Sequence, residues 1–240
     1  MISEDVIAGI RRDLAARADE KTRDGAGLFF KEEVHFHGVK SGAVRAIARE
    51  YFPRGWEKAA VWSLCEELLR SGYLEESGIA CDWAERLKQA FEPEDFAVFE
   101  RWLHTYVSNW AVCDSLCNHA VGSFLEMYPG YLPRLEVWAR SENRWVRRGA
   151  AVSLVLPARK GMFLAEVVAI ADLLLTDPDD LVQKGYGWML KEAGRAHPDE
   201  VFSFVMARRQ QMPRTALRAA VEKFPADRRA QATAKDAGRG

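Results

Sequence analysis

Apolar side chains recur at intervals of three and four residues along most of this 240-residue chain. Two clear examples are the sets Val44, Ile47, Ala48, Tyr51 and Phe99, Trp102, Leu103, Tyr106. This spacing places the apolar groups on one face of an α-helix. No run of alternating β-branched residues is bounded by turn signals, so we expect no strands. The pattern predicts an all-α protein.

Turn-forming residues interrupt this helical pattern at short intervals. They lie at residues 53–55, 71–72, 91–93, 108–109, 129–130, 141–143, 157, 177–178 and 197–198. The segments between them are mostly about 12 to 18 residues long, which suits packed antiparallel helices. We therefore expect roughly ten to twelve helices, and pairs of about 35 to 40 residues match the size of HEAT-type repeats. A compact helical bundle is the alternative.

Some helix starts are marked by side chains that can cap them. Ser108 or Asn109 can accept a hydrogen bond from the first turn of one helix, and Asn143 can do so for another. Pro178 is expected at the first position of a further helix, where a missing N–H costs nothing.

Composition is typical of a folded soluble protein, with 48% hydrophobic and 29% charged residues, and it excludes wholesale disorder. No change of composition marks a linker. We therefore expect one HEAT-like domain over residues 1–225 and a flexible C-terminal tail over residues 226–240. Eight tryptophans are many for this length, and such side chains must be buried, stacked or both.

Four cysteines are few for this length and indicate a reducing compartment. Cys113, Cys117 and His119 could supply half of a metal site, but no second ligand pair has zinc-like spacing. We expect buried core thiols instead, with no metal or cofactor. The first twenty residues lack the apolar run of a signal peptide, and acidic residues interrupt the most apolar segment, 163–175. These features predict a cytoplasmic protein without a membrane span.

Charge is distributed unevenly along the chain. The formal net charge is −1, which argues against binding nucleic acid or membranes by bulk charge. Residues 1–139 carry a balance of −7, whereas residues 140–240 carry +6. An acidic half joined to a basic half suggests a local face for an anionic partner. An unevenly solvated surface explains the same asymmetry.

Two short segments place charged groups beside tryptophans. Trp110 and Asp114 are four residues apart, so a helix presents an indole and a carboxylate on one face. A core tryptophan and a carboxylate near a helix N-terminus would be the structural alternative. Arg144, Arg147 and Arg148 form a cationic face suited to phosphates. An exposed face paired with nearby acids is the alternative there.

A third segment, residues 182–192, contains Trp188 and two glycines within a predicted helix. Gly185 and Gly187 lack side chains and allow another group to approach the helix closely. The pair is too short to indicate a phosphate-binding loop, because no strand precedes it.

Four motifs, taken in order and spacing, resemble those of the AlkD-like DNA alkylation repair proteins. They are Phe36-x-Gly38-Val39-Lys40, Asn109-Trp110-x-x-x-Asp114, Asn143-x-Trp145-x-Arg147-Arg148-x-Ala150 and Asp179-x-x-Val182-Gln183-Lys184-x-x-Gly187-Trp188-x-Leu190-Lys191-Glu192. The resemblance spans residues 29–224. It implies a curved, superhelical HEAT-like α-solenoid whose concave basic groove binds damaged duplex DNA. It also implies a monomeric, monofunctional glycosylase that excises positively charged N-alkylpurines such as 7-methylguanine and 3-methyladenine.

The resemblance also assigns roles to individual residues. Asp114 would stabilise positive charge that develops on the sugar, while Trp110 and Trp188 would hold the sugar and backbone of the lesion. The predicted DNA-binding residues are Arg144, Arg147, Arg148, Lys184 and Lys191, and which of Arg147 and Arg148 faces DNA is open. Two alternatives remain: a non-catalytic protein that binds distorted or branched DNA, and a helical scaffold for another protein.

The sequence departs from the family pattern at both ends of the resemblance. Active relatives commonly carry arginine where this chain has Lys191, which keeps the charge but loses the bidentate fork. Phe29 and Phe30 lie where some relatives present a tyrosine, so a hydroxyl contact to DNA is missing.

Overall fold

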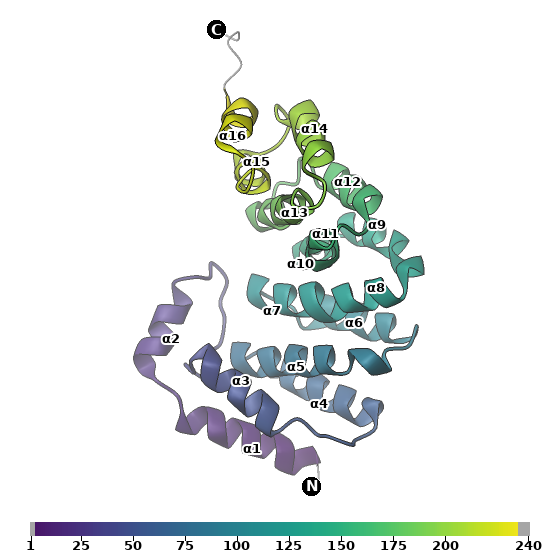
Figure 1. Cartoon of the computed structure of the whole chain (residues 1–240). Coiled ribbons are helices and arrows are strands. Elements are labelled where there is room, and N and C mark those ends of the chain that lie inside the picture. Colours follow the sequence, from purple (N-terminus) through teal and green to yellow (C-terminus); the bar gives the residue numbers. More distant parts are fainter. Residues whose placement is uncertain (1–2, 235–240) are drawn as a thin grey trace. The chain divides into compact units, whose positions relative to one another are not determined.

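A computed structural model describes residues 3–234 of the chain (Figure 1). Within this range all regular structure is helical, apart from an isolated bridge between His35 and Tyr73. The predicted all-α class is therefore confirmed. The helices group into two compact units, residues 1–120 and residues 121–240, so the single domain expected over 1–225 stays a prediction.

The first unit stacks its helices in two rows. Its helices are α1 (Ser3–Ala16), α2 (Glu20–Gly27), α3 (Ser41–Glu50), α4 (Lys58–Arg70), α5 (Leu74–Arg86), α6 (Asp95–Thr105) and α7 (Trp110–Ser115), with a 3₁₀ turn at Lys88–Ala90. Helices α1, α3, α5 and α7 pack side by side in that order, and α4 packs against α5 and α1. The Trp62 ring of α4 meets the edges of Phe99 and Trp102 of α6. This two-row stacking is what a HEAT-type array requires.

The second unit repeats the arrangement. Its helices are α8 (Gly122–Met127), α9 (Pro133–Ala139), α10 (Arg144–Val152), α11 (Val155–Arg159), α12 (Leu164–Leu173), α13 (Asp180–Ala193), α14 (Pro198–Arg208), α15 (Arg214–Ala220) and α16 (Ala226–Thr233), with a 3₁₀ turn at Pro129–Tyr131. Helices α10, α13 and α15 form one row, while α9 packs against α10 and α12.

The tryptophans separate into core and surface groups. Trp62, Trp83, Trp102, Trp138 and Trp145 are buried, whereas Trp56, Trp110 and Trp188 are partly exposed. Buried indole N–H groups donate hydrogen bonds in Trp62, Trp83 and Trp102; Trp83 Nε1, for example, donates to the Ala48 carbonyl at 2.8 Å. Two of the three partly exposed indoles are those that the sequence assigns to a site.

The structure has more and shorter helices than the ten to twelve expected, because several predicted helices are divided. A π-helical segment, Leu116–Val121, follows α7 and leads into α8. Such one-turn π segments interrupt helices without ending them.

Two further expectations differ from the structure. Pro178 does not occupy the first position of α13, because Asp179 is the N-cap and accepts hydrogen bonds from the N–H groups of Leu181 and Val182 at 2.9 and 3.2 Å. The tail expected over residues 226–240 begins as a helix, α16, which packs on α14 and α15 and buries Ala232. Residues 235–240 lie outside the described part of the chain.

Candidate functional site

Helix α7 presents Trp110 and Asp114 one turn apart. Asn109 caps the helix, since its Oδ1 accepts a hydrogen bond from the Val112 N–H at 3.0 Å. Val112 and Cys113 turn into the core, whereas Trp110 and Asp114 are partly exposed. The predicted pairing of an indole with a carboxylate on one face is therefore confirmed, and Trp110 is not a core residue.

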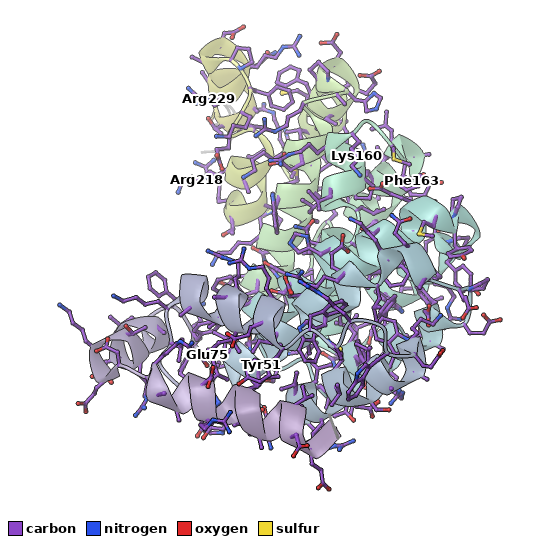
Figure 2. The ribbon with its side chains drawn as sticks, turned by 60° about the horizontal axis from the view of Figure 1, so that its bottom comes forward. Tyr51, Glu75, Lys160, Phe163, Arg218 and Arg229 are labelled. Atoms are coloured by element: carbon purple, nitrogen blue, oxygen red, sulfur yellow. The ribbon has the colours of Figure 1, made fainter. Side chains whose placement is uncertain are left out.

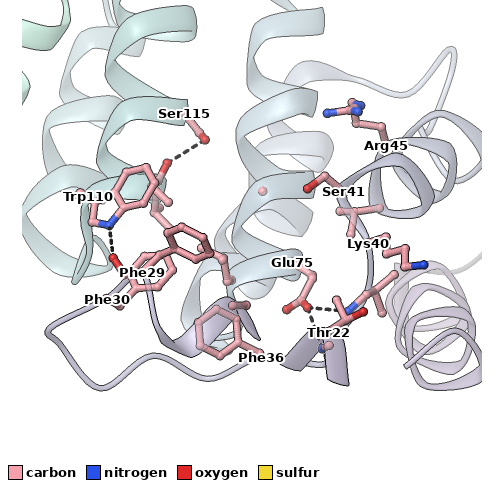
Figure 3. A pocket seen from close by; sticks show the side chains of 18 residues that line it. Thr22, Phe29, Phe30, Phe36, Lys40, Ser41, Arg45, Glu75, Trp110 and Ser115 are labelled. Atoms are coloured by element: carbon pink, nitrogen blue, oxygen red, sulfur yellow. Dashed lines mark hydrogen bonds between the residues drawn. The ribbon is translucent and has the colours of Figure 1, made fainter. Parts of the chain in front are cut away.

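The Trp110 indole is held by the segment that follows α2. Phe30 stacks on it with ring centroids 5.2 Å apart and planes inclined by 15°. The indole Nε1 donates to the Phe29 carbonyl at 3.3 Å (Figure 3). These contacts join residues about eighty positions apart and set the orientation of the ring. The two phenylalanines, noted in the sequence only as departures from a family pattern, are therefore its direct neighbours.

A cavity of about 690 Å³ opens beside Trp110 (Figure 3). Its walls come from α2, α3, α5, α7 and the segment between α2 and α3. Figure 3 shows aromatic side chains on one side of the cavity, from Phe29, Phe30, Phe36 and Trp110. The other side carries polar and charged side chains, from Ser41, Lys40, Arg45 and Glu75. Neither the cavity nor its cations were predicted from the sequence.

The early motif around Gly38 is held in place by a buried carboxylate. Glu75 of α5 accepts hydrogen bonds from the backbone N–H groups of His37, Gly38 and Val39 at 3.0, 2.8 and 3.0 Å. Gly38 has φ +87°, and a Cβ there would lie 2.7 Å from the Asp19 carbonyl oxygen. The motif is thus a structural turn that leads into α3 and places Lys40 at the cavity.

A second carboxylate, Glu76, anchors the same turn to α1. Its Oε2 accepts hydrogen bonds from Arg11 Nε and Nη2 at 3.1 and 3.0 Å, and its Oε1 lies 2.9 Å from His37 Nε2. Burial raises the pKa of Glu76, but the hydrogen bonds from His37 and Arg11 outweigh this effect and leave the pKa below its usual value. The group is therefore held as a carboxylate.

In the second unit, two of the predicted DNA-binding arginines are tied to acidic residues. Asn143 caps α10 as expected, with Oδ1 accepting from the Trp145 N–H at 2.9 Å. Arg144 Nε lies 2.8 Å from Asp179 Oδ2, and its guanidinium covers the Trp145 ring at 4.6 Å. The expectation of a basic face paired with nearby acids therefore holds for Arg144.

The Arg147 guanidinium donates hydrogen bonds to a carboxylate and to two backbone carbonyls of the protein. Its Nε and Nη2 donate to the nearly buried Asp177 carboxylate at 2.6 and 3.3 Å. Its Nη1 donates to the carbonyls of Ser141 and Glu142, both at 2.9 Å. Arg147 thus joins the turn before α10 to the turn before α13.

Arg148 points instead along the face of α13. Its side chain is only 5% exposed, and Nη1 donates to the Leu181 carbonyl. A Cβ on Gly185 would lie 3.3 Å from the Arg148 Cγ. The Arg148 side chain therefore passes over Gly185, and the lack of a side chain at this position leaves room for it.

Helix α13 carries the remaining predicted residues. Trp188 is partly exposed; Lys184 Nζ lies 3.2 Å from Asp180 Oδ2, and Lys191 Nζ lies 3.2 Å from Glu222 Oε2. Trp110 and Asp114 belong to the first unit and the other six residues to the second, so a groove shared by all eight stays a prediction.

Exposed arginines near the C-terminus were overlooked in the sequence. Arg214 and Arg218 lie one turn apart on α15, and both are exposed. Figure 2 shows Arg218 on α15 and Arg229 on α16. Their i, i+4 spacing, together with the basic balance of the C-terminal half, is the signal that could have found the first pair.

All four cysteines are free and buried, as expected. Cys113 and Cys117 are inaccessible, whereas His119 is exposed, so these three side chains do not converge. Among residues 3–234, no group of three or more histidine, cysteine or acidic side chains could hold a metal ion. Over the same residues, no helix has the length and apolar character needed to cross a membrane.

Comparison with known proteins defines the class. The chain belongs to the DNA alkylation repair enzyme family, whose model matches residues 10–224. A solved structure described as a predicted DNA alkylation repair enzyme from Enterococcus faecalis is similar with a TM-score of 0.78 and 18% identity, over 88% of this chain and 98% of that one. A search of curated protein sequences found no match.

A second solved structure is the alkylpurine DNA glycosylase AlkC of Pseudomonas fluorescens, bound to DNA containing an abasic site analog. It is similar with a TM-score of 0.50 and 19% identity, over 92% of this chain and 62% of that one. At these identities the similarities show the fold. They agree with the α-solenoid architecture expected from the sequence.

Proposed function

We propose that this protein is a DNA glycosylase that excises positively charged N-alkylpurines from duplex DNA. Family membership supports a role in the repair of alkylated DNA. The observation that carries the more specific proposal is the presentation of Trp110 and Asp114. Helix α7 holds a partly exposed indole and a partly exposed carboxylate one turn apart, and the indole of Trp110 also lines a cavity.

Excision of a cationic base requires little more from the protein than a carboxylate placed near the sugar. An N7- or N3-alkylated purine already carries a positive charge, so it leaves as a neutral base when the bond from C1′ to the purine nitrogen breaks and its electrons move to the ring. Positive charge then develops on the sugar. A carboxylate about 4 Å away stabilises that charge by roughly 4 kcal/mol at an effective dielectric constant of about 20. This corresponds to about three orders of magnitude in rate.

Water then attacks C1′ and loses a proton, which leaves an abasic sugar. In this proposal Asp114 stabilises the oxocarbenium-like charge and orients the water. Trp110 and Trp188 hold the sugar and backbone of the lesion against aromatic faces, where a cationic nucleotide is also attracted.

The arginines take different parts in DNA binding. Because Arg147 donates its hydrogen bonds to Asp177 and to two backbone carbonyls, we assign it the positioning of the turns before α10 and α13. Lys184, which is half exposed, is the stronger candidate for a phosphate contact, and Arg144, Arg148 and Lys191 remain in the proposed binding set.

The test compares the release of 7-methylguanine and 3-methyladenine by wild type, Asp114→Asn and Asp82→Asn. Asp82 is a matched control, since it is also a partly exposed helical aspartate but pairs with Arg86 on α5. We expect Asp114→Asn to lower the rate by two or more orders of magnitude and Asp82→Asn to leave it unchanged.

Equal release by all three proteins would remove Asp114 from the mechanism. DNA binding without release by wild type would instead favour the non-catalytic DNA binder. A lack of salt-sensitive DNA binding would favour the protein scaffold, because phosphate contacts release counterions and steepen the salt dependence.

A further inference from the structure

Asn118 is a buried polar side chain just beyond the helix that carries Asp114. The residue is only 8% exposed, and its Oδ1 accepts no hydrogen bond from any residue that the structure describes. The chain has two other asparagines, Asn109 and Asn143, and each accepts a hydrogen bond from a backbone N–H. A buried amide oxygen without a donor is costly. Asn118 is therefore a candidate for binding a small polar ligand.

Trp110, Asp114 and Asn118 follow one another at intervals of four residues. Helix α7 ends at Ser115, and the π-helical segment Leu116–Val121 continues it with hydrogen bonds between residues five apart. Residues four apart stay on one side of the helix through this change, so Asn118 lies one turn beyond Asp114. At this spacing Cβ atoms are about 5–6 Å apart. One water molecule can bridge two side chains at that separation.

Other polar neighbours of Asp114 are less suited to share a ligand with it. The Ser115 hydroxyl donates to the Ala111 carbonyl at 2.8 Å, within the helix itself (Figure 3). His119 is exposed to solvent. Asn118 differs from both, since it is buried and its oxygen has no donor among the described residues. Its position in a π segment also fits a site, because such segments often occur at functional sites.

We propose that the Asn118 amide and the Asp114 carboxylate together hold the water that attacks C1′. This role rests on the proposed function, because C1′ belongs to the alkylated nucleotide. The water donates one hydrogen bond to Asp114 and the other to Asn118 Oδ1, which leaves its lone pairs free to face the sugar. A carboxylate alone would fix one hydrogen of the water, whereas two acceptors fix its orientation.

The hydrolytic step is balanced without a further reagent. The alkylpurine leaves with the electron pair of its bond to C1′, and the sugar becomes cationic. The water oxygen then forms the new bond to C1′. One proton passes from the water to Asp114 and from there to solvent. Asn118 stays neutral, because its amide oxygen accepts a hydrogen bond without taking up the proton.

Asn118→Leu separates this role from a structural one. Leucine is close to asparagine in size and removes a buried amide oxygen that has no donor, so the variant should fold at least as stably as wild type. With excess protein, we expect release of 7-methylguanine to slow about tenfold, as for the loss of one neutral hydrogen bond. Affinity for the methylated duplex should not change. Asn118→Asp, which keeps an acceptor oxygen, should recover most of the rate.

Ser115→Ala is the matched control, because Ser115 adjoins Asp114 but its hydroxyl is bonded within the helix. We expect it to release alkylpurines at the wild-type rate. Equal release by wild type and Asn118→Leu would overturn the proposal and leave the glycosylase in place. If Asn118→Leu failed to fold, Asn118→Ala would replace it, with the same slower release expected and the same contrary result.

A double-mutant cycle tests the shared water without relying on base release. Urea unfolding compares wild type, Asn118→Leu, Asp114→Ala and the double variant. If one water joins the two side chains, the effect of Asp114→Ala on the unfolding equilibrium constant should change at least threefold when Asn118 is also replaced. The pair Asp114→Ala and Ser115→Ala should be additive.

The cycle also keeps the two proposals distinguishable. A wild-type protein that releases no alkylpurine would refute the glycosylase, and with it the attack on C1′. Coupling between Asp114 and Asn118 would then still support the water site, whereas additive effects would overturn it.

Discussion

The close packing of α13 on α15 predicts that Gly187→Ala destabilises the protein. A Cβ at Gly187 would lie 2.8 Å from both the Ala216 carbonyl oxygen and the Ala219 Cβ, whereas ordinary contacts begin near 3.4 Å. The shortfall is 0.6 Å. Both neighbouring atoms belong to the backbone or are attached directly to it, so no side chain can swing away. The two helices must separate.

Overpacking of this kind costs about 1–3 kcal/mol. The intrinsic preference of a helix for alanine over glycine offsets roughly 0.5–1 kcal/mol of that cost. We therefore expect Gly187→Ala to lower the free energy of unfolding by about 1–2 kcal/mol. Because α13 also carries Trp188, the same displacement should slow base excision.

Urea unfolding followed by circular dichroism measures the change, with Gly130→Ala as the control in the same unit. Gly130 has no atom within 4 Å of an added Cβ and no positive φ. This control should be neutral or stabilising by up to about 1 kcal/mol. If Gly187→Ala were as stable as wild type while Gly130→Ala behaved as expected, the tight α13–α15 contact would be wrong.

Three further predictions concern single side chains. Glu75→Ala leaves three backbone N–H groups without their acceptor and should destabilise the protein by roughly 2–3 kcal/mol in urea unfolding; Glu75→Gln, which keeps one acceptor oxygen, should cost less. The lowered pKa of Glu76 means that its contribution is present above the unfolded-state pKa and is lost as pH falls through the folded-state pKa. On acidification, the melting temperature of wild type should therefore fall further than that of Glu76→Gln. Equal decreases in the two proteins would contradict this. Lys184→Ala should reduce the slope of log affinity against log salt by about 1, and an unchanged slope would place Lys184 away from phosphates.

Features set by neighbouring residues could be predicted from the sequence. Helical periodicity gives the all-α class, and the caps at Asn109 and Asn143 depend only on hydrogen bonds within the next three residues. The four-residue spacing of Trp110 and Asp114 likewise predicts that they share one face of a helix, because this depends only on local helix geometry. Pro178 was misplaced because Asp179, one residue later, offers a stronger cap.

Features set by distant contacts could not be predicted. Phe30 reaches Trp110 only because α2 and its following segment fold back beside α7, and no periodicity records that approach. The role of Glu75 is equally remote, since its three donors lie more than thirty residues earlier. The glycines of α13 were expected to allow a close approach, but only the structure shows that Arg148 and α15 provide it.

The most direct test of the central claim is release of free alkylpurine by the wild-type protein. Methylated duplex DNA is incubated with excess protein, and released 7-methylguanine and 3-methyladenine are identified by mass spectrometry together with the abasic sites that remain. We predict base release well above spontaneous depurination, with one abasic site for each base released. Stable binding of the methylated duplex with release no faster than in buffer would contradict the account.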